Sequence, residues 1–489
     1  MCLVAHRLQF ETFHGQDPSG THGDKGPINI SGSTFRSSRA EDAFVAAAGK
    51  AGWKEFPDLQ VLDANNGFQR AQRYISPDGK RQDTASRYLH PLLQDGKHQN
   101  LHVLVEHQVM RVLFEDNRAV GVEFKPNPLF HPDSDPCPAQ SILASKLVVL
   151  SSGALGTPLI LERSGVGDPT ILSRASIPIV ASLPGVGRSY QDHNLLVYPY
   201  HSSLSPSETF DALADGRIAP PELIQNNPAF LGWNGQDVTC KLRPRDSEIP
   251  SLGTAFETAW NRDFAPFPNR PLLLMSLVGA YGADRSFLTE GDKGKQFFSI
   301  SAFSAYPYSR GEIHVATNAS TSANTGGQDG HGDGIDFDPG FFSDEVDLKM
   351  HVWSYKTQRE IARRMDCYRG EVSAAHPPFG ATSAAKCGIR KGPITDEEGD
   401  IVYSEEDDMV LEKWLRENVG TTWHSLGTCA MRPMDENGVV DERLRVYGVE
   451  GLGVADLSVV PRNVAANTAS TAMMIGEKAA DLFVGELVD

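Results

Sequence analysis

The feature that constrains the fold most strongly is a short apolar run, which is followed by a glycine turn and a helix-forming segment. Lys146–Leu150 is apolar after its first residue, Ser151–Gly156 is small and flexible, and a helical pattern runs from Thr157 to about Arg163. Such a run predicts a strand buried on both faces, as in a parallel sheet. Pro158 would stand in the first turn of the helix, where a missing N–H costs little. Strand, turn and helix in this order form the βα unit of nucleotide-binding sheets.

An acidic residue ends a second apolar run near the C-terminus. Leu452–Asp456 reads Leu-Gly-Val-Ala-Asp, which predicts a strand with Asp456 at its carboxyl end. In open α/β sheets this end of a strand faces the ligand crevice. The alternative is an aspartate that only forms a turn, and the strand by itself leaves both interpretations open.

A helix is predicted to begin around Asn467. Asn467, Thr468 and Ser470 are residue types that cap helix N-termini, and the amphipathic segment Ala472–Phe483 follows. A helix N-terminus carries partial positive charge and free N–H groups, so it favours an anionic ligand. The alternative is simple capping of a helix whose Met and Ala face packs in the core.

His424 lies between Trp423 and Ser425, shortly before Gly427. A histidine titrates near neutral pH, so His424 is a candidate general base. The alternative is a hydrogen-bonded core histidine. Gly427 and the small residues after it would let the backbone pass close to a bulky planar ligand.

Other segments predict the remaining secondary structure. Alternating residues predict a small antiparallel meander between residues 99 and 124. Its strands are expected at Asn100–Val105, Met110–Phe114 and Ala119–Phe124. Further strands are expected at Gly26–Ile30, Phe297–Phe303 and Glu312–Ala316, and helices at 344–366 and Asp407–Asn418. Residues 317–334 are rich in Ser, Thr, Asn and Gly, which predicts an exposed loop.

Composition narrows the class of protein. The chain has 489 residues, enough for two or three domains, and its net charge of -18 opposes nucleic-acid binding. The 6 cysteines form no CxxC pair, which opposes a disulfide scaffold and a metal site and suits a reducing compartment. There is no apolar run of the ~18 residues that a membrane span needs, no signal-peptide core and no peroxisomal C-terminal tripeptide. We therefore expect a cytoplasmic protein.

Three ordered blocks carry a family resemblance. They are Gly153–Gly167, Leu183–His193 and the C-terminal run that contains Trp423-His424 and Asn467-Thr468. Together they resemble the glucose-methanol-choline (GMC) oxidoreductase family, and within it the fungal alcohol oxidases. The resemblance implies FAD as cofactor and a two-domain α/β fold. A Rossmann-like FAD-binding domain, incomplete at its N-terminus, would comprise 96–195 and 416–489, and an antiparallel-sheet-and-helix substrate domain would comprise 1–95 and 196–415.

The resemblance also implies a reaction and a site. The reaction is oxidation of a primary alcohol to an aldehyde, in which His424 takes the hydroxyl proton and Asn467 holds the oxygen. The cofactor-binding positions that it implies are Val109, Asp456, Leu457, Asn467 and Thr468. The expected partner is a small-molecule alcohol, with no nucleic acid and no membrane. A homo-oligomer stays an open alternative.

The sequence departs from the family at its beginning. The family's glycine-rich βαβ fingerprint, the acid that follows it and its Gly-Gly-Ser-Ser block have no counterpart here, and residues 1–30 already resemble substrate-domain sequence. We therefore expect the ADP-binding segment to be missing, either because the gene model starts at an internal methionine or because the protein is a truncated paralogue. Two alternative functions stay open, a non-catalytic protein that no longer holds flavin tightly and a non-redox lyase.

Overall fold

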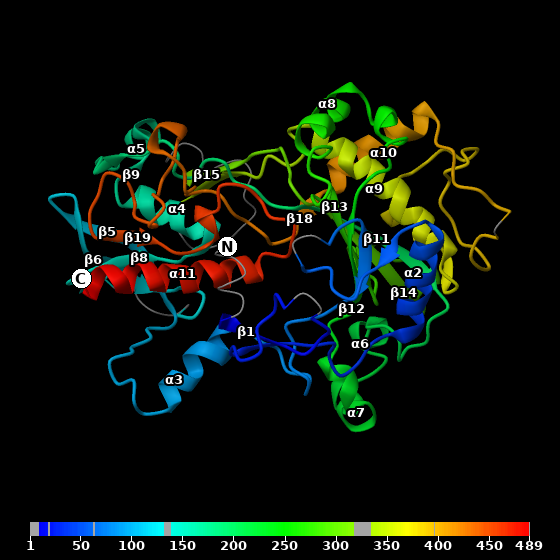
Figure 1. Ribbon diagram of the computed structural model, residues 1–489, viewed down its shortest axis with the longest axis horizontal. Helices are drawn as coiled ribbons and strands as arrows, with labels where there is room; N and C mark the ends of the chain where they lie inside the picture. The colour runs from blue at the N-terminus through cyan, green and yellow to red at the C-terminus, as the bar shows by residue number, and fades with distance from the viewer. Residues whose placement is uncertain are drawn as a thin grey trace. The chain divides into compact units, whose positions relative to one another are not determined.

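The chain folds into two compact units, each assembled from segments that are far apart in the sequence. The computed structural model describes residues 9–17, 20–61, 64–131, 138–316, 334–395 and 397–488. Unit 1 contains Met1–Pro91, Asn194–Tyr308 and Asp344–Gly420 (Figure 1). Unit 2 contains Leu92–His193, Ser309–Ser343 and Thr421–Asp489.

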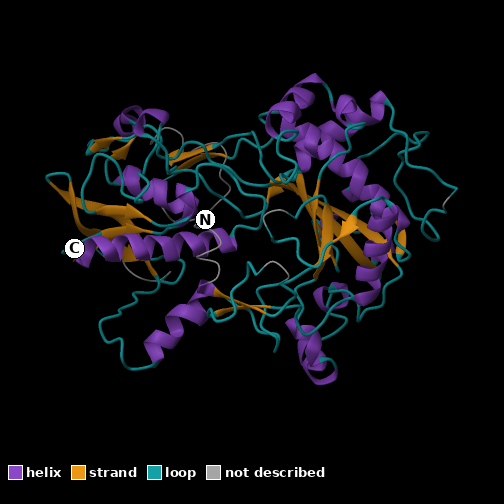
Figure 2. Cartoon of the chain, in the orientation of Figure 1, coloured by secondary structure: helices purple, strands orange, loops and turns teal. Residues whose placement is uncertain are grey.

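A largely antiparallel sheet organises unit 1 (Figure 2). Its strand order is β17-β11-β14-β13-β12-β4-β3. Its strands are β3 (Lys54–Glu55), β4 (Gly67–Arg70), β11 (Asn194–Ser202), β12 (Gln236–Leu242), β13 (Leu273–Val278), β14 (Gln296–Ser304) and β17 (Tyr368–Glu371), and β18 (Gly420–Thr421) pairs with β11. The predicted strand Phe297–Phe303 is confirmed as part of β14, which is buried at every position. Helix α9 (Glu345–Arg364) contacts β14, so this strand belongs to the core of unit 1.

The helices of unit 1 begin where the sequence supplies capping groups. The helices predicted at 344–366 and Asp407–Asn418 are confirmed as α9 (Glu345–Arg364) and α10 (Glu405–Asn418). The Asp344 carboxylate accepts from the Val346 N–H at the start of α9, and Ser404 forms a capping box with Asp407 at the start of α10. The other helices of the unit are α2 (Ser38–Lys50), α6 (Asp211–Ala214), α7 (Pro220–Asn226) and α8 (Thr254–Asp263).

A parallel pair of strands forms the centre of unit 2. β8 (Val148–Leu150) pairs in parallel with β19 (Leu452–Val454), which confirms both predicted strands. α4 (Gly153–Arg163) follows β8 directly, and α11 (Ala469–Val488) runs beside the strand pair (Figure 1). Ile475, Ala479 and Phe483 of α11 belong to the same apolar cluster as residues of β8 and β19. This packing fixes α11, and thus its N-terminal end, on the strand pair.

Smaller elements surround this centre. They are β5 (His107–Glu115), β6 (Arg118–Pro126), β7 (Gln140–Leu143), β9 (Val166–Gly167), α5 (Pro169–Arg174), β10 (Ala181–Ser182), β15 (Glu312–Val315) and β16 (Ile335–Asp338). The strand predicted at Glu312–Ala316 is therefore confirmed as β15. In unit 1, β1 (Glu11–Phe13) pairs in parallel with β2 (Ile28–Ile30), which confirms the early strand. α3 (His90–Gln94) spans the sequence junction between the units.

The meander is present, but its first predicted strand is wrong. β5, β6 and β7 form the antiparallel sheet, whereas residues 101–105 carry no strand. Val103, Leu104 and Val105 are exposed, so their alternation reflects no buried face. Glu106 then adopts a left-handed conformation (φ 60°), which separates this segment from β5.

The prediction that β8 is buried on both faces is also wrong. Val149, its middle residue, is 41% exposed, and β8 pairs only with β19 among the described residues. The helix after it begins at Gly153, four residues earlier than predicted, so Pro158 stands inside α4 and not in its first turn.

Two further predictions concern loops and membranes. Residues 317–333, nearly all of the predicted exposed loop, lie outside the described residues. Within the described part of the chain, no helix is both long and apolar enough to span a bilayer.

Candidate active site

His424 and Asn467 come together in unit 2, although they are 43 residues apart in the sequence. Asn467 Nδ2 lies 3.3 Å from His424 Nε2. His424 is buried, whereas Asn467 is exposed immediately before Thr468, the buried residue that precedes α11. The structure therefore places a histidine ring and a side-chain amide side by side at the N-terminal end of a helix.

Asp192 holds the backbone of His424 in place. Its Oδ1 accepts from the His424 N–H at 3.1 Å, and its Oδ2 accepts from the hydroxyl of Thr421. Burial raises the pKa of Asp192 above its usual range. Between these two anchored residues, Trp423 adopts a left-handed conformation (φ 58°) and leaves its side chain 80% exposed. The carboxyl group thus fixes the turn that presents the histidine.

His193 contacts the other side of the His424 ring, and sequence reasoning assigned it no role. The Nδ1 atoms of the two rings lie 2.8 Å apart, and the rings are perpendicular. His193 Nε2 lies 2.9 Å from the carbonyl oxygen of Val464. The sequence could have drawn attention to His193, because it is the last residue of one of the three blocks that carry the family resemblance.

Burial controls the protonation of His424. It lowers the pKa of this imidazole to about 4, because the charged form is poorly solvated inside the protein. The ring is therefore neutral at pH 7, with a lone pair on one nitrogen. A neutral imidazole is the form that accepts a proton from a substrate.

Asp456 lies at the carboxyl end of β19, as predicted, and binds its own chain. Its Oδ2 accepts from the Gly153 N–H at 3.0 Å and from the Thr157 hydroxyl at 2.6 Å, and its Oδ1 accepts from the Ser458 N–H at 2.7 Å. It therefore joins β19 to the first turn of α4 and caps the short helix that contains Leu457. The structure shows the turn and capping role, and the interpretation in which Asp456 faces a ligand stays a prediction.

The remaining predicted positions fall in different surroundings. The Leu457 carbonyl accepts from the Gly427 N–H at 3.2 Å. Gly427 has a positive φ of 91°, and a Cβ there would lie 2.8 Å from the Ser189 carbonyl oxygen. A glycine is therefore needed here for the approach of another part of the protein backbone. Val109 lies half-buried in β5 of the meander, in a different sheet from β19.

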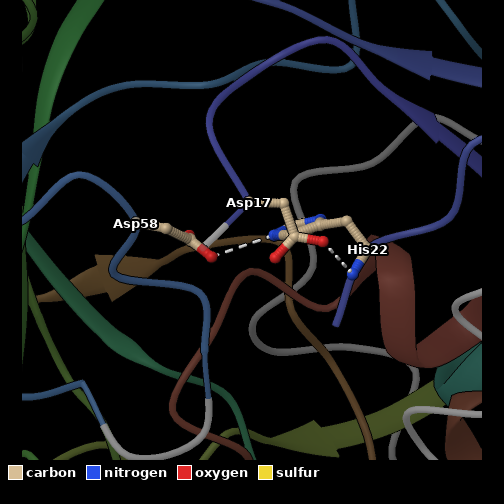
Figure 3. Close-up of side chains that lie close together, drawn as sticks. All are labelled: Asp17, His22 and Asp58. Atoms are coloured by element: carbon tan, nitrogen blue, oxygen red, sulfur yellow. Dashed lines mark hydrogen bonds and ion pairs between the residues drawn. The ribbon is translucent and has the colours of Figure 1, made fainter. Parts of the chain in front are cut away.

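A second polar cluster, in unit 1, was not predicted at all. His22 Nδ1 lies 2.7 Å from Glu11 Oε1, and His22 Nε2 lies 3.0 Å from Asp58 Oδ2. Asp17 Oδ2 accepts from the backbone N–H of His22 (Figure 3). Glu11, His22 and Asp58 are buried. Each ring nitrogen of His22 therefore faces one carboxyl group, and the imidazole lies between the two acids.

Comparisons with known proteins identify the family of this chain. Two family models, both described as GMC oxidoreductase, match residues 7–195 and 307–476. The alcohol oxidase of Candida boidinii is 33% identical over 539 residues, covering 99% of this chain and 78% of the relative. The chain belongs to the GMC oxidoreductase family. Alcohol oxidase 1 of Komagataella phaffii is 34% identical, with 95% of this chain and 74% of the relative covered.

The fold of this GMC oxidoreductase also matches solved structures. An FAD-dependent oxidoreductase from Chaetomium thermophilum superimposes with a TM-score of 0.73 at 22% identity, covering 99% of this chain and 80% of that chain. The two-domain α/β fold, the FAD cofactor and an oxidoreductase activity on alcohols follow from the family. The N-terminal family model matches from residue 7, so the match does not support the prediction that the ADP-binding segment is missing.

The described residues of this GMC oxidoreductase fit the ring end of FAD. His424 and Asn467 converge beside the first turn of α11, where the helix dipole favours an anionic group. In the described part of the chain, Asn463 Nδ2 is buried without a hydrogen-bond partner. Buried polar atoms of this kind require a partner, which a bound polar group would supply.

Proposed function

We propose that this protein oxidises a small primary alcohol to the aldehyde, with His424 as general base and Asn467 as the residue that orients the alcohol oxygen. The 3.3 Å contact between Asn467 Nδ2 and His424 Nε2 carries the proposal. An alcohol oxygen beside both atoms would donate its proton to Nε2 and accept a hydrogen bond from Nδ2. The alcohol oxidases among the relatives support this substrate class.

The residues of the protein handle the hydroxyl proton. When bound, FAD supplies the acceptor for the carbon-bound hydrogen and its two electrons. The neutral His424 imidazole receives the hydroxyl proton, and the Asn467 amide N–H stabilises the negative charge that develops on the oxygen. We further propose Val109, Asp456, Leu457, Asn467 and Thr468 as cofactor-binding positions, because the resemblance to the family implies a role in FAD binding for them.

Purified protein tests the proposal directly. We expect flavin absorbance, and aldehyde formation from primary alcohols ranging from methanol to benzyl alcohol, with oxygen or an artificial electron acceptor. His424→Ala should lower kcat by about 10²–10⁴-fold, the usual contribution of a general base, while flavin content is retained. His98→Ala is the matched control, because His98 is an exposed histidine of the same unit. A protein that takes up no FAD, or a His424→Ala variant with normal kcat, would refute the proposal.

A further inference from the structure

A chain of three hydrogen bonds runs through the two facing histidines. It begins at the Val464 carbonyl oxygen, 2.9 Å from His193 Nε2. It continues across the 2.8 Å gap between His193 Nδ1 and His424 Nδ1, and it ends where Asn467 Nδ2 lies 3.3 Å from His424 Nε2. Each ring nitrogen of both histidines therefore has one polar neighbour in this chain.

The two ends of the chain fix the direction of every bond. A carbonyl oxygen only accepts, so His193 Nε2 carries a proton, and a neutral His193 then has a lone pair on Nδ1. His424 Nδ1 must donate to that lone pair, which leaves His424 Nε2 without a proton. At the other end the Asn467 amide NH₂ donates, so it requires the same bare Nε2.

We propose that His193 is a positioning residue that holds His424 in the tautomer with the proton on Nδ1 and the lone pair on Nε2. This inference rests on the proposed function, since it concerns the base of that reaction. In the other tautomer Nε2 would carry a proton, and the nitrogen beside Asn467 would not accept one from the alcohol.

The hydrogen bonds that hold the loop around His193 come from its backbone and from its neighbour Asp192. Its backbone carbonyl accepts from the Thr422 hydroxyl at 2.6 Å, and the neighbouring Asp192 binds the His424 N–H. Those bonds do not involve the imidazole of His193, so replacing the ring leaves the contacts between the two loop segments in place. The side chain is therefore open to substitution while the presentation of His424 is kept.

Two substitutions distinguish positioning from packing. His193→Phe keeps a ring of similar size but removes the acceptor, and kcat should fall roughly 100-fold, within the range of a general base. His193→Gln offers an oxygen to His424 Nδ1–H and an NH₂ group to the Val464 carbonyl, so it should recover most of that loss. Flavin content and melting temperature are measured for both variants.

Nitrogen-15 NMR of the histidine-labelled holoenzyme supplies a readout that does not depend on turnover. His424, assigned by difference with His424→Gln, should show a protonated Nδ1 and a bare Nε2 in the wild type and in His193→Gln. In His193→Phe the tautomer with a protonated Nε2 should appear beside the original one, because only the longer contact with Asn467 still favours a bare Nε2. A wild type with Nε2 protonated, an unchanged tautomer in His193→Phe, or a His193→Phe kcat equal to wild type would overturn the proposal. A normal tautomer in a protein that oxidises no alcohol would instead refute the proposed function.

Discussion

The hydroxyl of Thr428 donates to the carbonyl oxygen of Ala154 at 2.7 Å. This carbonyl is the one that the N–H of residue 158 would bind in a regular helix, and residue 158 is proline. A side chain from a distant segment therefore completes the hydrogen bonding of α4. The contact also ties this helix to the segment that follows His424.

Thr428→Val should lower the free energy of unfolding by about 1–3 kcal/mol, because it leaves the buried Ala154 carbonyl without a partner. Urea unfolding measures the loss. Thr428→Ser keeps the hydroxyl and should cost about 1 kcal/mol at most, for the missing methyl group. Adding Pro158→Ala to Thr428→Val restores a backbone donor, so the double variant should recover stability. If it is no more stable than Thr428→Val, the role assigned to Thr428 is wrong.

His22→Ala should destabilise the protein by about 1–3 kcal/mol, because the buried carboxyl groups of Glu11 and Asp58 would lose the ring nitrogens that they contact. Thermal or urea unfolding at pH 7 is the measurement. His14→Ala is the matched control, since His14 is an exposed histidine of the same unit bonded to Asn29. Similar losses in the two variants would show that the buried bridge contributes nothing special.

Stability should fall as the pH is lowered below 6.5, in part because of His376. Burial lowers the pKa of His376 in the folded protein to about 4, so between these values the unfolded chain binds the proton more readily. The stabilisation is fully present above pH 6.5 and is lost as pH falls through about 4, roughly 3 kcal/mol in total. His376→Gln should flatten the pH dependence of the unfolding free energy. Identical slopes in both proteins would contradict this assignment.

Asn467→Asp should move the acid limb of kcat/KM to higher pH. In the wild type the base is lost as pH falls through about 4, where His424 becomes protonated. A carboxylate beside Nε2 favours the imidazolium and should raise that pKa by about 1–3 units. Asn467→Ala should lower activity without raising the limb, which serves as the comparison. A pH profile of kcat/KM that does not move in Asn467→Asp would show that Asn467 does not act on His424.

Asp456→Ala should cost about 1–2 kcal/mol of stability, because the carboxylate caps one helix and binds the first turn of another. The loss should appear in flavin-free protein as well as in holoenzyme. Asp456→Asn, which keeps one acceptor oxygen, should lose less. If only the holoenzyme is destabilised, the residue acts on the cofactor alone.

The sequence allowed the main elements to be predicted wherever the signal was local. The apolar runs that became β8 and β19 predicted two strands, and the helices predicted at 344–366 and Asp407–Asn418 were found close to those bounds. The signal failed where burial depends on a neighbour. Val103–Val105 alternate as a strand would, yet no strand covers them among the described residues, and their side chains are exposed.

The residues of the site were likewise predicted only in part. Residue types and family resemblance pointed to His424 and Asn467, which the structure brings together. His193 lies in a block that carries the family resemblance, but its contact with His424 spans 231 residues, and no local pattern reveals that contact. The Glu11–His22–Asp58 cluster was missed for the same reason, since Asp58 lies 36 residues beyond the histidine.

Asp192 and His193 are adjacent in the chain, and each binds a different part of His424. One binds the backbone and the other binds the ring. The position of the His424 backbone and the hydrogen bond to its ring therefore depend on neighbouring residues, but through separate contacts. A substitution of the His193 side chain would change the ring contact and leave the backbone contact of Asp192 in place.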